Sequence, residues 1–102
     1  MRHLRQDHNR IQDPAEKIGE HEPVFLIRGK DAAAPNAIRA WAKVAQSMGA
    51  DQEHMDAVRR FANYVEYWQE GNGCKVPDAP LHMLDPKLQI SLGSCSTSGG
   101  SC

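Results

Sequence analysis

The sequence predicts a mainly α-helical protein organised around one antiparallel helical hairpin. Two stretches, at about 35–48 and 52–70, carry apolar residues three or four positions apart, which is the spacing of one helix face. The break between them, Gly49-Ala50-Asp51, is short enough to send the second helix back along the first. Around this hairpin we expect one short strand and extended termini.

A chain of 102 residues is one domain at most, with a core of modest size. We expect a flexible N-terminal arm at 1–22, a small domain at 23–92 and a flexible tail at 93–102. The arm is polar, and the tail is rich in Gly, Ser and Cys. Within the arm, Asp13-Pro14-Ala15-Glu16 suits a single helical turn.

One strand is expected at 24–28, where consecutive apolar residues stand between Pro23 and Gly29. A lone strand needs a pairing partner, and the alternating apolar and polar residues at 88–92 are the best candidate within the chain. The alternative is that 24–27 packs on the helices as an extended segment without a ladder. The sequence leaves both arrangements open.

The ends of the two helices are marked by residues that favour such positions. Pro35 can begin the first helix after a turn capped by Asp31, and Gly49 stands where a left-handed terminal residue belongs. Asp51 is placed to cap the second helix, which we expect to stop before Gly71-Asn72-Gly73.

The core is expected where the apolar stripes of the two helices meet. Trp41 and Phe61, as large apolar side chains on these stripes, are assigned to this core. The stripes consist of Ile38, Trp41, Val44, Ala45 and Met48 in the first helix and of Met55, Val58, Phe61, Ala62, Val65 and Trp68 in the second.

Two carboxylates, Glu66 and Glu70, stand near the C-terminal end of the second helix, where the helix dipole disfavours negative charge. The sequence leaves two explanations for them. Either a cationic side chain lies nearby, or both carboxylates are solvated.

The aromatic residues of the second helix cover more of its circumference than one partner helix can bury. Two alternatives are open for Tyr64, Tyr67 and Trp68. Either the segments at 24–27 and 81–84 cover them, or they form an exposed aromatic patch of the kind that marks protein interfaces.

Composition and charge argue against several classes of partner. The formal net charge is −1, and basic and acidic residues are mixed along the chain, so electrostatics does not favour a nucleic acid or an anionic membrane. No apolar run approaches the roughly 18 residues of a membrane span, and the N-terminus lacks the apolar segment of a secretory signal. We therefore expect a location in the cytoplasm, or in a particle assembled there.

The residues that can carry chemistry are too scattered to form an evident site. The five histidines and three cysteines include no Cys-x2-Cys or His-x3-His pair, so no metal site is expected. Cys74 follows a helix end whose dipole does not activate a thiol, and His82 lies in a loop bracketed by prolines. The sequence thus predicts no enzyme, no cofactor and no small-molecule substrate.

Several segments of the chain carry a resemblance: Asp13-Pro14, Lys17-Ile18-Gly19, Glu22-Pro23-Val24-Phe25-Leu26-Ile27-Arg28 and Ala37-Ile38-Arg39-Ala40-Trp41-Ala42. In their order they are similar to small uncharacterised proteins encoded by tailed phages and prophages. The resemblance spans roughly residues 13 to 69 and excludes the tail. It implies a non-enzymatic phage accessory or virion-associated protein, and it brings no functional residues.

The tail contains Ser94, Ser96, Thr97 and Ser98 together with Cys95 and Cys102. It is similar to the core of ribosomally made precursors of the lanthipeptide kind, which implies dehydration of Ser and Thr and addition of cysteine sulfur. Gly99-Gly100 lies inside this segment, whereas the usual leader boundary precedes the core. The alternative is a flexible end whose cysteines, Cys95 and Cys102, form a disulfide.

These observations predict a non-catalytic module that binds another protein or its own copies. The alternative function is a precursor of a modified peptide with its core at 93–102. For the module, the predicted binding surface consists of Tyr64, Tyr67 and Trp68 with an edge formed by Val24, Phe25, Leu26 and Ile27.

Overall fold

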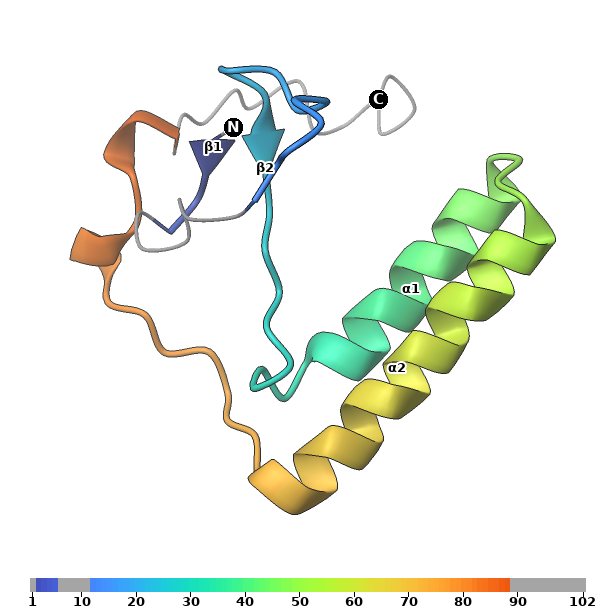
Figure 1. Cartoon of the computed structure of the whole chain (residues 1–102). Coiled ribbons are helices and arrows are strands. Elements are labelled where there is room, and N and C mark those ends of the chain that lie inside the picture. Colours follow the sequence, from blue (N-terminus) through green and yellow to red (C-terminus); the bar gives the residue numbers. More distant parts are fainter. Residues whose placement is uncertain (1, 6–11, 89–102) are drawn as a thin grey trace. The chain divides into compact units, whose positions relative to one another are not determined.

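The computed structural model describes residues 2–5 and 12–88, which belong to two compact units (Figure 1). One unit runs from Ile27 to Asp78 and contains both long helices. The other consists of the segments that precede and follow it in the sequence. The division into segments 1–22, 23–92 and 93–102 stays a prediction.

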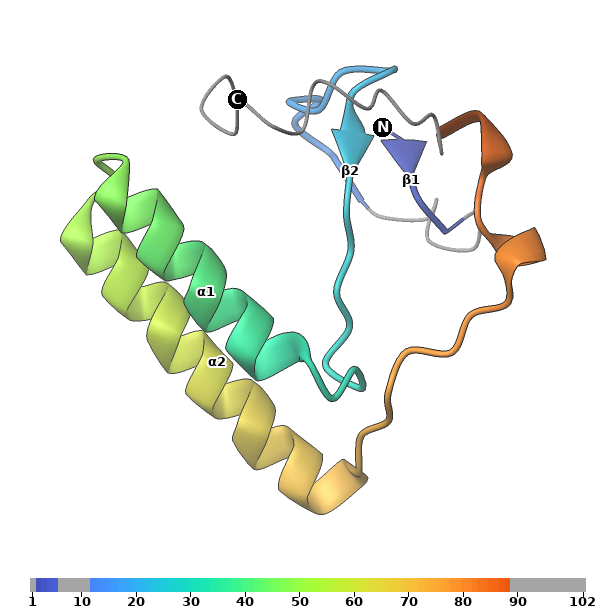
Figure 2. The same cartoon turned by 180° about the vertical axis from the view of Figure 1, so that it is seen from behind.

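The predicted helical hairpin is confirmed. Helix α1 spans Ala34–Ser47 and helix α2 spans Gln52–Asn72, and both views show them side by side (Figures 1 and 2). Helix α2 extends two residues beyond the predicted end at 70, because its last turn includes Gly71 and Asn72.

The residues expected at the helix ends occupy those positions. Pro35 lies in the first turn of α1, and Gly49 follows this helix with a φ of +103°. Asp51 is the N-cap of α2, and its carboxylate accepts a hydrogen bond of 3.0 Å from the backbone N–H of His54. Gly73 ends α2 with a φ of +79°, a conformation that glycine adopts without strain. The turn chemistry therefore directs the chain back on itself.

The interface between the helices is built mainly from small side chains. Ala42 and Ala62 are completely buried, and Ala34 is 1% exposed. Met55 is the only large side chain that is fully buried among the described residues, and Val65 lies beside this line. Alanines at these positions let two helices approach closely, but they provide little apolar area to stabilise the hairpin.

The assignment of Trp41 and Phe61 to the core is wrong, since their exposed fractions are 55% and 57%. In α1 the buried line passes through Ala34 and Ala42, and not through Trp41. Residues four apart lie one above the other on a helix, so Ala34 and Ala42 share one face of α1. Because Trp41 is one position before Ala42, its side chain points to one side of the interface.

The segments flanking the hairpin pair with each other where the helices begin and end. The backbone N–H of Ala32 donates to the carbonyl of Lys75 at 2.8 Å, and the N–H of Lys75 donates to the carbonyl of Lys30 at 2.9 Å. The chain that enters α1 and the chain that leaves α2 are thereby held together.

The second unit contains a minimal parallel ladder. Strand β1, Arg2–His3, pairs with strand β2, Pro23–Val24. The ladder ends at Val24, and residues 25–28 continue without pairing, so the predicted segment at 24–28 is a short strand followed by an extended stretch. This matches the alternative of an extended segment without a ladder for 25–27. Of the expected pairing segment 88–92, all but Leu88 lies outside the described residues.

The same unit includes short helical turns after the hairpin, η2 at Leu81–Met83 and η3 at Pro86–Leu88. The backbone N–H of Asp85 donates to the carbonyl of Leu4 at 2.9 Å. Near the N-terminal arm's predicted turn, the N–H of Glu16 donates to the carbonyl of Asp13 at 3.0 Å. This turn confirms the single turn that the sequence predicts.

Candidate functional site

The two flanks of the hairpin interface differ in chemistry. On α1, Arg39 and Gln46 lie on one side of the buried line through Ala42, while Trp41 lies on the other side. The side chains of Arg39 and Gln46 form hydrogen bonds with side chains of α2. The polar groups of α2 therefore lie on the same flank of the interface as Arg39 and Gln46. We call the two flanks the polar face and the apolar face.

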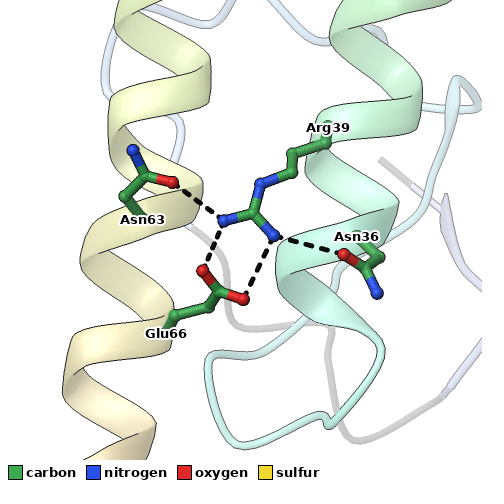
Figure 3. Close-up of polar contacts among 4 residues, drawn as sticks. All are labelled: Asn36, Arg39, Asn63 and Glu66. Atoms are coloured by element: carbon green, nitrogen blue, oxygen red, sulfur yellow. Dashed lines mark hydrogen bonds and ion pairs between the residues drawn. The ribbon is translucent and has the colours of Figure 1, made fainter.

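The polar face is centred on Arg39, whose guanidinium reaches from α1 to α2 (Figure 3). It donates to both carboxylate oxygens of Glu66, at 2.5 and 3.2 Å, and to the amide oxygen of Asn63 at 2.8 Å. A further bond of 3.2 Å reaches Asn36 on its own helix. Such a two-pronged contact with a carboxylate fixes the geometry of both groups.

The expected cationic neighbour of Glu66 is therefore Arg39. The hydrogen bond from Arg39 lowers the pKa of Glu66, and its positive charge acts in the same direction, while desolvation opposes both. Nearer the hairpin turn, Arg59 repeats the pattern by bonding Gln46 across the interface at 2.8 Å and Asp56 at 3.1 Å. Polar side chains thus connect the helices along this whole flank.

The apolar face carries large side chains that no such bridge covers. Within each helix the spacing is the same: positions i, i+3 and i+7. The exposed fractions of Val44, Met48 and Tyr64 are 57%, 73% and 58%, comparable with those of Trp41 and Phe61. The face consists of Trp41, Val44 and Met48 from α1 and of Phe61, Tyr64 and Trp68 from α2.

A groove of about 370 Å³ lies on this face towards the end where α1 begins and α2 finishes. Ile38 of α1 and Phe61, Tyr64 and Trp68 of α2 all line it, so Ile38 shares one flank with these aromatic residues. The remaining wall is formed by residues 27–30, just before α1.

Gly29 in this wall lies beside the ring of Trp68, and a Cβ on Gly29 would lie 3.7 Å from that ring, an ordinary van der Waals contact. The side-chain amide of Gln69 donates to the carbonyls of Gly29 and Asp31, both at 2.8 Å. Lys30 Nζ donates to the carbonyl of Asn72 at 2.8 Å, at the end of α2 where a cation is favoured. The groove wall is therefore fixed to α2 by side-chain hydrogen bonds.

Within the hairpin unit, the predicted aromatic patch is exposed at its tyrosines. Tyr67 is 73% exposed and Trp68 is half-buried. Tyr64, Tyr67 and Trp68 also line a shallow hollow at the C-terminal end of α2, together with Glu70, Gly71 and Asn72.

The predicted edge at Val24 to Ile27 is divided between the two units. Val24, Phe25 and Leu26 belong to the unit that holds the strands, with Phe25 exposed, and only Ile27 stays with the hairpin. Of the predicted binding residues, the hairpin unit thus brings together Ile27, Tyr64 and Trp68 in one groove.

Sequence reasoning missed Trp41, Val44 and Met48 as surface residues, and it missed Arg39 as a bridge. The available signal was Arg39 itself, which stands directly beside the apolar stripe of the first helix. A polar residue at that position shows which side of the stripe faces a polar neighbour.

Among residues 2–5 and 12–88, no group of three or more His, Cys, Asp or Glu side chains is placed to hold a metal ion. Cys74 is an exposed free thiol. Within the same ranges no helix is both long and apolar enough to span a membrane. Cys95 and Cys102, assigned to modification or a disulfide, lie outside the described part of the chain.

Comparison with models of protein families, with curated proteins and with solved structures finds no match to this chain.

Proposed function

We propose that this chain is a non-catalytic protein–protein interaction module and that the apolar face of its hairpin is the binding surface. The observation that carries this proposal is the exposure of Trp41, Phe61 and Tyr64 on one flank. Buried interface centres are enriched in such aromatic residues, because each can bury a large area with few rotatable bonds.

The position of these aromatics supports a surface that is ready to bind. They project from two long helices joined by a capped turn, and the groove beside them has a wall fixed by Gln69 and Lys30. A partner that inserts an apolar side chain into this groove pays little conformational entropy for ordering the site.

The setting that we propose is a phage particle or its assembly, and the module is an accessory or structural component there. This part of the proposal is supported by the resemblance of residues 13 to 69 to small phage proteins. The charge of −1 and the mixed charge pattern are compatible with a protein partner reached through apolar contacts.

A photoreactive phenylalanine analogue at position 61 tests the proposal in the cells that encode the chain. We expect it to form a covalent protein adduct, because Phe61 lies on the apolar face. The same analogue in place of Lys43, an exposed residue of α1 on the flank opposite Trp41, is the matched control and should give no adduct.

The adduct must also disappear when Trp41→Ser is added, since that change alters the apolar face without touching the photoreactive site. Mass spectrometry then identifies the captured protein. A phage structural protein or a second copy of the chain supports the phage setting, whereas a host protein removes it. Equal adducts from positions 43 and 61 contradict a binding role for the apolar face.

A further inference from the structure

We infer that the occupant of the apolar face is a second copy of this chain, so that two hairpins form an antiparallel four-helix bundle. The inference rests on the proposed function, because it names the partner of that same surface. Four observations support it: the apolar spacing in both helices, the exposed area, the absence of charge on the face and the charges at its ends.

Each helix carries two neighbouring apolar stripes, which is the pattern of a helix within a four-helix bundle. The inner stripe of α1 passes through Ala42, and that of α2 passes through Met55 and Ala62. Both inner stripes are buried between the two helices of the hairpin. The outer stripe has members at i, i+3 and i+7 in both helices, which is the a, d, a spacing of helices that pack nearly parallel or antiparallel. A helical partner therefore fits this face.

The exposed area is that of a stable interface. An aromatic side chain presents about 150–250 Å², so the exposed halves of Trp41, Phe61 and Tyr64 amount to roughly 300 Å². With Val44, Met48 and the groove rim, the face reaches roughly 700 Å², close to the ~800 Å² per partner of a standard interface. The hairpin's own interface is built largely from alanine, so association would supply much of the apolar burial of the assembly.

The six side chains of the apolar face are uncharged, and the charged residues beside them are Arg28 and Lys30 in the groove and Arg60 one turn before Tyr64. In a two-fold symmetric contact each residue meets the same surface of the other copy, so a charged face would place like charges together. A neutral face avoids this penalty. The equal spacing of the two outer stripes also lets α1 of one copy lie against α2 of the other.

The charges at the two ends of the face select the orientation. Arg28 and Lys30 line the groove at the open end of the hairpin, while Asp51 and Glu53 lie at the turn where α2 begins. A two-fold axis that crosses the helices puts the open end of one copy beside the turn of the other. Basic residues then meet acidic residues at both ends of the interface.

Sedimentation equilibrium of the full chain over a range of concentrations tests this inference. The buffer contains a reducing agent, because exposed Cys74 could otherwise link two copies. We expect a reversible species of twice the chain mass of 11.3 kDa. Phe61→Ser should raise the dimer dissociation constant at least about 30-fold, the effect of removing one central hot-spot side chain.

Lys43→Ser is the matched control, since Lys43 is an exposed helical residue on the flank opposite Trp41. It should leave the dissociation constant unchanged. Circular dichroism establishes that each variant keeps its helices. If Phe61→Ser loses helicity, Met48→Ser replaces it, because that exposed residue lies at the margin of the hairpin.

The inference is overturned if the wild-type chain stays a monomer at its highest soluble concentration. It is also overturned if the dimer survives the substitutions on the apolar face. The proposed function fails separately. A monomer whose position 61 still captures a different protein keeps the interaction module and removes the self-association. A monomer without any adduct at position 61 removes both.

Discussion

The polar face and the apolar face lie on either side of the same line of buried alanines. They differ in whether side chains of the opposite helix cover them. On the polar face, Arg39 and Arg59 reach across the interface and bond to side chains of the opposite helix. On the apolar face, Trp41 and Phe61 are more than half exposed, and no equivalent bridge closes the flank. One flank is closed by side chains of the hairpin, whereas the other leaves large apolar side chains exposed.

This difference separates what stabilises the hairpin from what the hairpin can bind. The side chains that hold the helices together are small or polar, and the largest apolar side chains lie mostly outside the interface. A mutation can therefore damage the fold without touching the binding surface, or alter the surface without unfolding the chain. The predictions below use that separation.

The largest effect is expected for Met55→Ala, since Met55 is 1% exposed within the hairpin. Removing a buried methionine side chain costs about 2–5 kcal/mol of unfolding free energy, through lost burial and the cavity left behind. The exposed Met48 is the matched control, and Met48→Ala should change the free energy by less than about 0.5 kcal/mol in dilute protein. Chemical denaturation measures both.

Measuring both methionine variants at several protein concentrations distinguishes the two effects further. The cost of Met55→Ala should be present at every concentration, because Met55 is buried within one chain. The cost of Met48→Ala should grow with concentration if the apolar face is covered by a second copy. Equal costs for the two substitutions in dilute protein would contradict the division between interface and surface.

A smaller effect is expected for Gln69→Ala, which tests how the groove on the apolar face is held. The substitution leaves the carbonyls of Gly29 and Asp31 without their bonds from Gln69. Each lost hydrogen bond costs roughly 1 kcal/mol, so a loss of about 1–2 kcal/mol is expected. Hydrogen exchange should quicken at the amides of residues 31 and 32.

The exposed Gln52, at the first position of α2, provides the control for Gln69. Gln52→Ala should leave both stability and exchange at residues 31 and 32 unchanged. Unaltered exchange in Gln69→Ala would show that the backbone pairing of Lys75 alone fixes the groove wall.

The sequence predicted the hairpin well because its determinants are local. The helical spacing, the short break with Gly49 and the cap at Asp51 act within a few residues, and the structure confirms each of them. The choice of which apolar residues face inward depends on the other helix. Large residues such as Trp41 stand beside Ala42, and only the packing of two helices decides that the alanine is buried.

The candidate site was predicted in part for the same reason. Tyr64 and Trp68 were recognised because α2 has more aromatic residues than one helix can cover. Trp41 and Met48 were missed because they were assigned to the interior. The pairing of β2 with Arg2–His3 joins segments about twenty residues apart, and two-residue strands carry too little pattern to predict.

The smallest effect is expected on the polar face, from the pH dependence of the bond between Arg39 and Glu66. The pKa of Glu66 is lowered below its ordinary value of 4.5, chiefly by the hydrogen bond from Arg39. A lowered pKa in the folded state contributes stability that is complete above pH 4.5 and is lost as the pH falls through the folded-state pKa. Glu66→Gln should lower the melting temperature slightly at neutral pH, and this difference should shrink in acid.

The matched background is Arg39→Gln, which removes the cation and keeps a polar side chain. In that background, Glu66→Gln should have a smaller effect at neutral pH, because the pair is already broken. Both groups are partly exposed, so water screens the interaction and the change in melting temperature stays well below that of Met55→Ala. A larger loss than that of Met55→Ala would mean that the polar face, and not the buried line of alanines and Met55, holds the hairpin together.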